Sequence, residues 1–117
     1  WPTVVAAPVE HKAVFYASST DGVRVSPRVL LSTRGRSVAH PALVLTGRGV
    51  PAVAWDGTGT SRGIWLTVRN PDGRFPEAVR VTASDATYPA MAQDGGGLVM
   101  AWRELNGDAT TIVVIRR

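Results

Sequence analysis

The chain of 117 residues has no cysteine, which excludes disulfide bonds and thiolate metal sites. It has no apolar run near the roughly 18 residues that a membrane-spanning helix needs, so no membrane span is expected. A sustained 3.6-residue apolar period, the signal of an amphipathic helix, is also missing. Acidic residues are outnumbered, 9 against 13 Lys and Arg, but the basic residues form no block. This scatter favours a solvated basic surface over a specific nucleic-acid site.

What the chain has instead is glycine and proline, 12 and 8 residues, between short apolar runs. Runs of this kind, rich in β-branched and aromatic residues and bounded by turn residues, predict β-strands. Nine such runs are found, at residues 14–17, 29–31, 42–45, 52–55, 64–68, 79–82, 90–92, 98–102 and 111–115. With 44% hydrophobic and 19% charged residues, the composition supports a buried core. The sequence therefore predicts one all-β domain.

The chain repeats itself with a period near 48 residues. His40-Pro41-Ala42 returns as Tyr88-Pro89-Ala90, and Ala54-Trp55 returns as Ala101-Trp102. The apolar run at 64–66 has counterparts at 14–16 and 112–114. A repeat of about 40–50 residues that holds four strands is typical of a propeller blade.

We therefore predict an incomplete β-propeller of four-stranded antiparallel blades. It would have a partial blade in residues 1–38, a complete blade in 39–86 and a partial blade in 87–117, with Trp1 near the end of a further strand. About two and a half blades cannot close a ring of four to eight, so exposed edges and faces are expected to need partners. The alternative is a small β-sandwich.

Two of the Asp-Gly pairs follow a Ser or Asn that stands two residues before the aspartate. The first is Ser19-Thr20-Asp21-Gly22, and the second is Asn70-Pro71-Asp72-Gly73-Arg74-Phe75. In such turns the Asp carboxylate accepts backbone N–H groups and the Gly takes a positive φ. The first turn has no aromatic residue close behind it, and the second has Asn-Pro where an Asp-box has Ser-x. The order of strands and turns nevertheless resembles the sialidase-like β-propeller repeat, with Ser19, Asp21, Gly22, Asp72, Gly73 and Phe75 as degenerate Asp-box positions.

The resemblance implies a fold more than an activity. Family sialidases bind an acidic sugar with an arginine cluster and use a tyrosine nucleophile with a Glu partner and an acid/base Asp. The Arg-Ile-Pro segment that carries their first arginine is absent here. No catalytic residue is assigned, and the sequence also lacks paired-histidine metal spacing and phosphate-binding glycine loops. Neither a metal nor a cofactor is expected.

We therefore expect a non-catalytic binding or scaffold module that acts in a larger assembly or as part of a longer propeller. The alternative is a fragment of a sialidase-like glycoside hydrolase whose catalytic residues lie outside residues 1–117. The expected partners are other propeller blades, from the same or another chain, and the candidate ligand is a glycan. The expected location is extracellular or periplasmic.

His40 and Tyr88 stand at equivalent places, where the predicted inner strand of each unit begins. In a propeller this position faces the central channel or its mouth, where ligands bind. The two rings are therefore candidates for contact with a ligand or partner. The alternative, which we favour, is that each ring packs its blade against the next.

The residues that follow each repeated tryptophan differ between the two units. Asp56 stands in one unit, and Arg103-Glu104 stands in the other. We expect Arg103 and Glu104 in an exposed loop, and we include all three residues among the ligand or partner candidates. Trp55 and Trp102 end equivalent strands, which favours packing between blades over sugar stacking.

Overall fold

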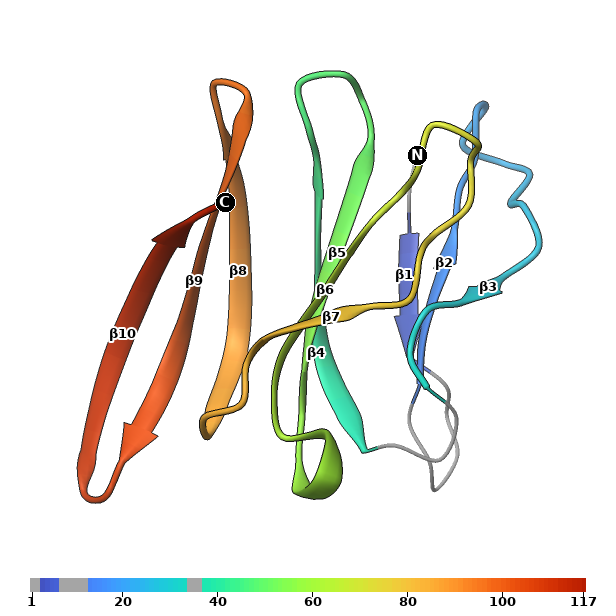
Figure 1. Cartoon of the computed structure of the whole chain (residues 1–117). Helices are drawn as coiled ribbons and strands as arrows, with labels where there is room; N and C mark the ends of the chain where they lie inside the picture. The colour runs from blue at the N-terminus through green and yellow to red at the C-terminus, as the bar shows by residue number, and fades with distance from the viewer. Residues whose placement is uncertain (1–2, 7–12, 34–36) are drawn as a thin grey trace.

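The computed structural model describes residues 3–6, 13–33 and 37–117, and Trp1 lies outside them. These residues form ten β-strands and one 3-10 turn, η1 (Gly59–Ser61), in three antiparallel sheets (Figure 1). The first sheet contains β1 (Thr3–Ala6), β2 (Val14–Ala17) and β3 (Val29–Leu30). The second contains β4 (Val38–Leu45), β5 (Pro51–Gly57), β6 (Gly63–Val68) and β7 (Val79–Thr82). The third contains β8 (Ala86–Asp94), β9 (Gly97–Asn106) and β10 (Ala109–Arg116).

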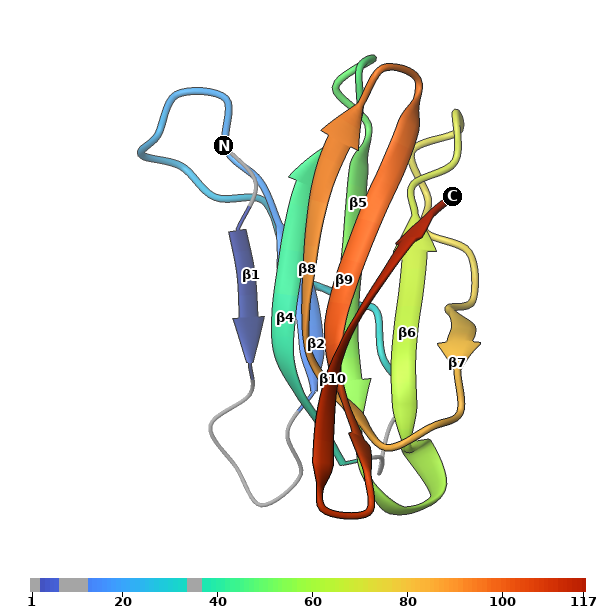
Figure 2. The same cartoon turned by 90° about the vertical axis from the view of Figure 1, so that its left-hand side faces the viewer.

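The prediction of an all-β chain is confirmed. Eight of the nine predicted runs lie wholly in strands, the ninth extends one residue past the end of β3 at Leu31, and β1 adds a tenth strand. Every pairing joins strands that are consecutive in the sequence, so each sheet is a simple antiparallel meander. The three sheets lie face to face, a layering that fits the β-sandwich-like alternative (Figures 1 and 2).

A core of buried side chains fills each of the two spaces between sheets. Between the first and second sheets lie Val14, Tyr16, Leu31, Val38, Val53 and Trp55. Between the second and third lie Ala52, Ala54, Ile64, Leu66, Ala86, Leu98, Met100 and Trp102. Successive side chains of a strand point to opposite faces. Strand β5 therefore contributes to both cores, and this explains why its seven residues are all buried.

The two repeated tryptophans lie in these cores. Trp55 packs between the first and second sheets, and Trp102 packs between the second and third. Both side chains therefore pack between neighbouring sheets and are not exposed for stacking on a sugar. No helix in the described part of the chain has the length and apolar character needed to cross a membrane.

Candidate functional site

His40 and Tyr88 occupy the same backbone irregularity in two successive sheets. The β4–β5 register shifts between Ala39 and Ala42, and the β8–β9 register shifts between Thr87 and Ala90. The residue inside each bulge has a left-handed backbone, with φ of 53° at His40 and 57° at Tyr88. A non-glycine residue in this conformation costs about 1–3 kcal/mol, and a residue before proline normally prefers extended backbone. Tertiary contacts must therefore hold both residues in place.

The sequence analysis placed the two rings where their strands begin, and this prediction was wrong. Strand β4 begins at Val38 and β8 begins at Ala86, so each ring follows two residues inside its strand. In the Pro-Ala pattern, the proline is the second residue of the bulge and the alanine is the first residue that pairs again. Because a bulge turns a side chain away from the regular alternation, it also sets the direction of each ring.

Asp56 is the residue that joins the two bulges. It lies near the end of β5, and only 2% of its surface is exposed. Its Oδ2 atom is hydrogen-bonded to His40 Nδ1 at 2.7 Å and accepts the backbone N–H of Tyr88 at 2.8 Å. A buried carboxylate must be paired to be tolerated, and these two bonds supply that pairing. One side chain thus fixes the bulge of its own sheet and binds the bulge of the next.

The rings and a guanidinium form a short stack, which we call the ring stack: His40, Tyr88 and Arg103. The His40 and Tyr88 rings have centroids 4.0 Å apart and an interplanar angle of 32°. The Arg103 guanidinium lies 5.3 Å from the centroid of the Tyr88 ring, a cation–π contact. Ring packing between neighbouring layers, the alternative that we favoured from the sequence, is what the structure has. Tyr88 and Arg103 are exposed, so the stack also presents a surface.

Four of the five candidate residues therefore come together, and Glu104 does not join them. Arg103 and Glu104 lie within β9, so the expectation that they stand in a loop was wrong. Glu104 Oε1 accepts hydrogen bonds from Ser84 Oγ and from Trp102 Nε1, the latter at 3.2 Å. These bonds, that from Ser84 first, lower the pKa of Glu104 below its ordinary value. Glu104 thus ties β9 to the segment before β8.

The first Asp-Gly turn has the geometry that its sequence predicts. Asp21 Oδ1 accepts the backbone N–H groups of Val23 and Arg24, both at 2.8 Å, and is also hydrogen-bonded to Ser19 Oγ. Gly22 has a φ of +78°, and its N–H donates to Ser19 Oγ. The bond from Arg24, followed by those from Val23 and Ser19, lowers the pKa of Asp21 below its ordinary value. The turn is therefore closed by its own side chains.

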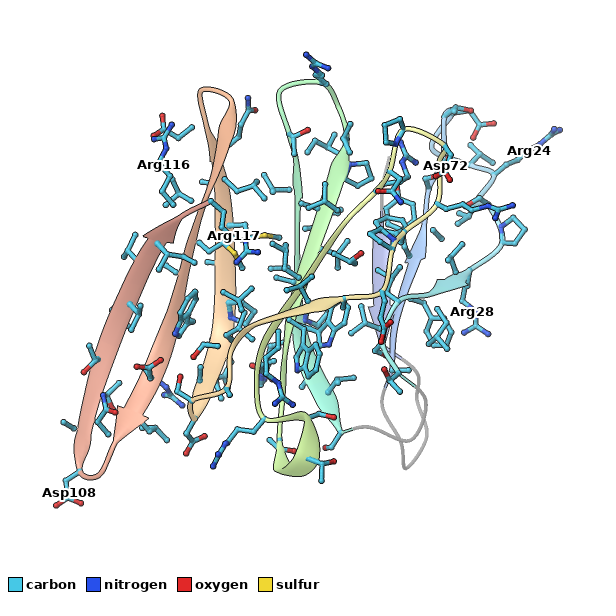
Figure 3. The ribbon with its side chains drawn as sticks, in the orientation of Figure 1. Arg24, Arg28, Asp72, Asp108, Arg116 and Arg117 are labelled. Carbon is cyan, nitrogen blue, oxygen red and sulfur yellow. The ribbon has the colours of Figure 1, made fainter. Side chains whose placement is uncertain are left out.

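The second turn is simpler. Asp72 Oδ1 accepts the backbone N–H of Arg74 at 2.9 Å, and Gly73 has a φ of +86°. Phe75 leaves this turn and packs against Tyr16 of the first sheet, with ring centroids 4.9 Å apart. Asp72 and Arg24 lie at one end of the sheets, whereas β4 and β8 begin at the other end (Figures 1 and 3). The two turns are thus structural closures remote from the ring stack.

Sequence reasoning predicted exposed faces in general but did not single out the face of the third sheet beside the ring stack. A shallow hollow of about 390 Å³ lies there, lined by Tyr88, Ala90, Ala101, Trp102, Arg103 and Ile112. Met100 and Trp102 are buried against the second sheet, so Ala101 and Arg103 point to the opposite side. The repeat offers a way to find this face, because Ile112 occupies the position that corresponds to the buried Ile64.

A second hollow, of about 220 Å³, lies between the second sheet and the segment that follows β3. Its lining includes Trp55, Trp65, Glu77 and Arg80. The Arg80 guanidinium lies 4.6 Å from the centroid of the Trp65 ring and donates to the backbone carbonyl of Thr60. These contacts hold Arg80 against the sheet, so the hollow is partly closed by its own lining.

The groups at the ring stack are suited to non-covalent binding of a ligand or partner. It offers two stacked rings, one guanidinium and an apolar floor, and the Asp56 carboxylate is already bonded. Among the described residues, no group of three or more His, Asp or Glu side chains is placed to hold a metal ion. Comparisons of the chain with protein-family models, curated proteins and solved structures found no match.

Proposed function

We propose that this chain is a non-catalytic scaffold module of the sialidase-like propeller type, completed by further sheets in a larger assembly. Three meander sheets follow one another along the chain, and each packs a face on the next. The same bulge, with the same left-handed residue before Pro-Ala, recurs 48 residues later. These features support a repeat in which each sheet is one blade.

The observation that carries the proposal is the bare face of the third sheet. In the second sheet, Ile64 and Leu66 are 0% and 6% exposed because the third sheet covers them. Their counterparts 48 residues later, Ile112 and Val114, are 66% and 63% exposed. An apolar face that is equivalent to a buried interface is best explained by a layer that covers it.

The edge of the third sheet supports the same conclusion. In the second sheet, β6 pairs with β7, but its counterpart β10 is the outermost strand of the third sheet. The outer side of this eight-residue strand pairs with no other strand in the described residues, and its outward backbone groups invite another strand. We infer that a fourth strand and a covering sheet, from the same protein or from a partner, complete this side of the third sheet.

The decisive experiment extends the chain by one repeat. Residues 69–117 would be appended after Arg116, because Val68 and Arg116 end the equivalent strands β6 and β10. The extension supplies a copy of β7 to pair with β10 and a copy of the third sheet to cover Ile112 and Val114. Hydrogen exchange should then slow strongly in β10, and the free energy of unfolding should rise.

The matched control carries Met100→Asp in the appended sheet only. Met100 is fully buried in the present interface, so a charge at its copy should prevent docking while leaving the original chain intact. Unchanged exchange in β10 for every extended chain that keeps Met100 in the appended sheet, whichever residue stands at the copy of Tyr88, would contradict the proposed function.

A further inference from the structure

The third sheet carries Arg103 where the second sheet carries Asp56, and this exchange specifies what the next layer must present. Asp56 faces the third sheet and accepts the N–H of its bulge residue, Tyr88. Arg103 takes the same place after the repeated tryptophan, on the bare side of its own sheet. A hydrogen-bond acceptor has thus been replaced by a group that only donates.

A covering sheet built like the third sheet would bring a backbone N–H to the guanidinium of Arg103. Two donors would then face each other where water is excluded, and the positive charge would be buried without a partner. The neighbours across the strand do not relieve this, because the register partners of Arg103 are Thr87 and Ile112. Within the described residues, Arg103 is paired with no carboxylate.

The Arg103 guanidinium is also held in place before any partner arrives. Its contact with the Tyr88 ring keeps it beside the hollow rather than extended into water. An arginine fixed on an aromatic face is suited to a carboxylate, which it binds through two parallel N–H groups. Preorganisation of this kind reduces the entropy lost on binding.

From this we infer that the surface formed by Arg103, Tyr88 and the adjoining hollow recognises an acidic side chain on the inner strand of the covering sheet, at the position equivalent to Tyr88. The inference rests on the proposed function. Aspartate fits the position well, since it tolerates the left-handed backbone that the bulge imposes. A large apolar side chain of the same sheet, equivalent to Met100 or Trp102, fills the hollow.

A second copy of the chain does not meet this requirement. At the position equivalent to Tyr88, the inner strands β4 and β8 of a second copy carry His40 and Tyr88 themselves, and neither residue is acidic. The second sheet is covered on both faces. No uncovered face in the described residues of a second copy therefore reproduces the interface, and the occupant is a different sheet with its own acidic inner strand.

The test is a charge-exchange cycle in the extended chain, measured by denaturant unfolding and by hydrogen exchange in β10. Tyr88→Asp in the appended sheet should raise the unfolding midpoint when Arg103 of the original chain is intact. Arg103→Asp should reverse this preference, because its carboxylate accepts the N–H of the unaltered Tyr88 copy and repels the new aspartate. We expect a coupling of about tenfold in the unfolding equilibrium constant.

Arg48→Asp serves as the matched control. Arg48 is exposed in the β4–β5 turn, and this substitution changes the net charge by the same amount as Arg103→Asp. Docking of the appended sheet without coupling between the two positions would overturn the inference and leave the proposed function standing. Failure of every extended variant to protect β10 would overturn both. Docking only of the variant with the appended aspartate would support both.

Discussion

Asp56 has the clearest structural role of any single residue in this chain. It is buried, charged and bonded to groups in two sheets, so its removal affects the sheet that carries it and the contact with the next. A buried carboxylate of this kind adds little to the free energy of unfolding compared with a well-packed apolar residue. Its removal is nevertheless strongly destabilising, because its partners are left unpaired.

We predict that Asp56→Ala lowers the free energy of unfolding by about 3–5 kcal/mol, because it leaves the Tyr88 N–H and the His40 ring without an acceptor. Asp56→Asn should cost less, since its amide oxygen still accepts one of the two bonds. Urea unfolding measures both. Asp94→Asn is the control: Asp94 pairs with Arg116 at the surface and should change stability by no more than about 1 kcal/mol. Equal losses at positions 56 and 94 would disprove the role given to Asp56.

The pKa of Asp21 gives a prediction in pH. Hydrogen bonds from the turn lower this pKa in the folded state, so the unfolded chain binds the proton more readily. The turn therefore gains its full stabilisation above the ordinary aspartate pKa of about 3.9, and loses it as the pH falls through the lower folded value. NMR spectra of the Val23 and Arg24 amides should report this transition below pH 3.9. Asp21→Asn should abolish it, and a midpoint above 3.9 would contradict the assignment.

Sequence reasoning found the residues of the ring stack but not their contacts. The repeated Pro-Ala beside them marks His40 and Tyr88 as equivalent positions of the two units. The bond from Tyr88 to Asp56 joins residues 32 positions apart in different sheets, so it depends on how those sheets stack. The left-handed backbone of His40 and Tyr88 could not be predicted either, because a His or Tyr before proline normally adopts an extended backbone.

At the scale of elements, the sheets depend on glycines where strands turn back. Gly57 and Gly63 are register partners at the close of β5 and the start of β6, on either side of η1. A Cβ atom at Gly63 would lie 1.9 Å from the carbonyl oxygen of Thr82, and its φ is +121°. Only glycine fits this close approach to β7.

We therefore predict that Gly63→Ala lowers the free energy of unfolding by at least about 2 kcal/mol, through steric overlap and backbone strain together. Thermal or urea unfolding measures the loss. Gly96→Ala in the β8–β9 turn is the control, because nothing lies within 4 Å of its Cβ position and its φ is not in the left-handed region. A Gly63→Ala protein as stable as the Gly96→Ala protein would refute the close contact.

The strands themselves were predictable, because period and turn chemistry are local. Their ends were not. Strand β9 continues to Asn106 although Arg103 and Glu104 are charged, since one faces the open side and the other finds partners in Ser84 and Trp102. Such polar residues look like a loop in the sequence, and only tertiary contacts place them in a strand.

At the scale of the whole molecule, the face of the second sheet that carries Ile64 and the face of the third sheet that carries Ile112 are equivalent in the repeat. The first face is buried and the second is exposed. This gives a matched pair for mutation. Ile64→Ala should cost about 2–4 kcal/mol, because it opens a cavity in the core between the second and third sheets. Ile112→Ala should cost less than about 1 kcal/mol, since Ile112 is exposed. Similar losses in urea unfolding would mean that Ile112 is already covered.

The same bare face leads us to predict concentration-dependent self-association of the chain. Ile112→Lys should reduce it without lowering the free energy of unfolding, whereas Thr110→Lys, on the same exposed strand, should have a smaller effect. Light scattering measures the association. A monodisperse monomer of 12.4 kDa at high concentration would contradict this prediction.

The 48-residue repeat predicted exposed edges and faces in general, whereas the identity of the bare face did not follow from any local pattern. Ile112 and Val114 read as core residues in the sequence, as Ile64 and Leu66 do. The two pairs are distinguished by the layer that covers one of them, and a local pattern carries no information about that layer.

The meander topology has a consequence for the gene. Because each strand pairs only with its neighbour in the chain, no sheet borrows a strand from a distant segment. An in-frame duplication or deletion of one repeat length is therefore expected to add or remove a whole layer without rethreading the others, as it does in proteins built from stacked repeats. Unequal recombination within the coding sequence can change the number of sheets in single steps, and selection then acts on the one interface that each new layer brings.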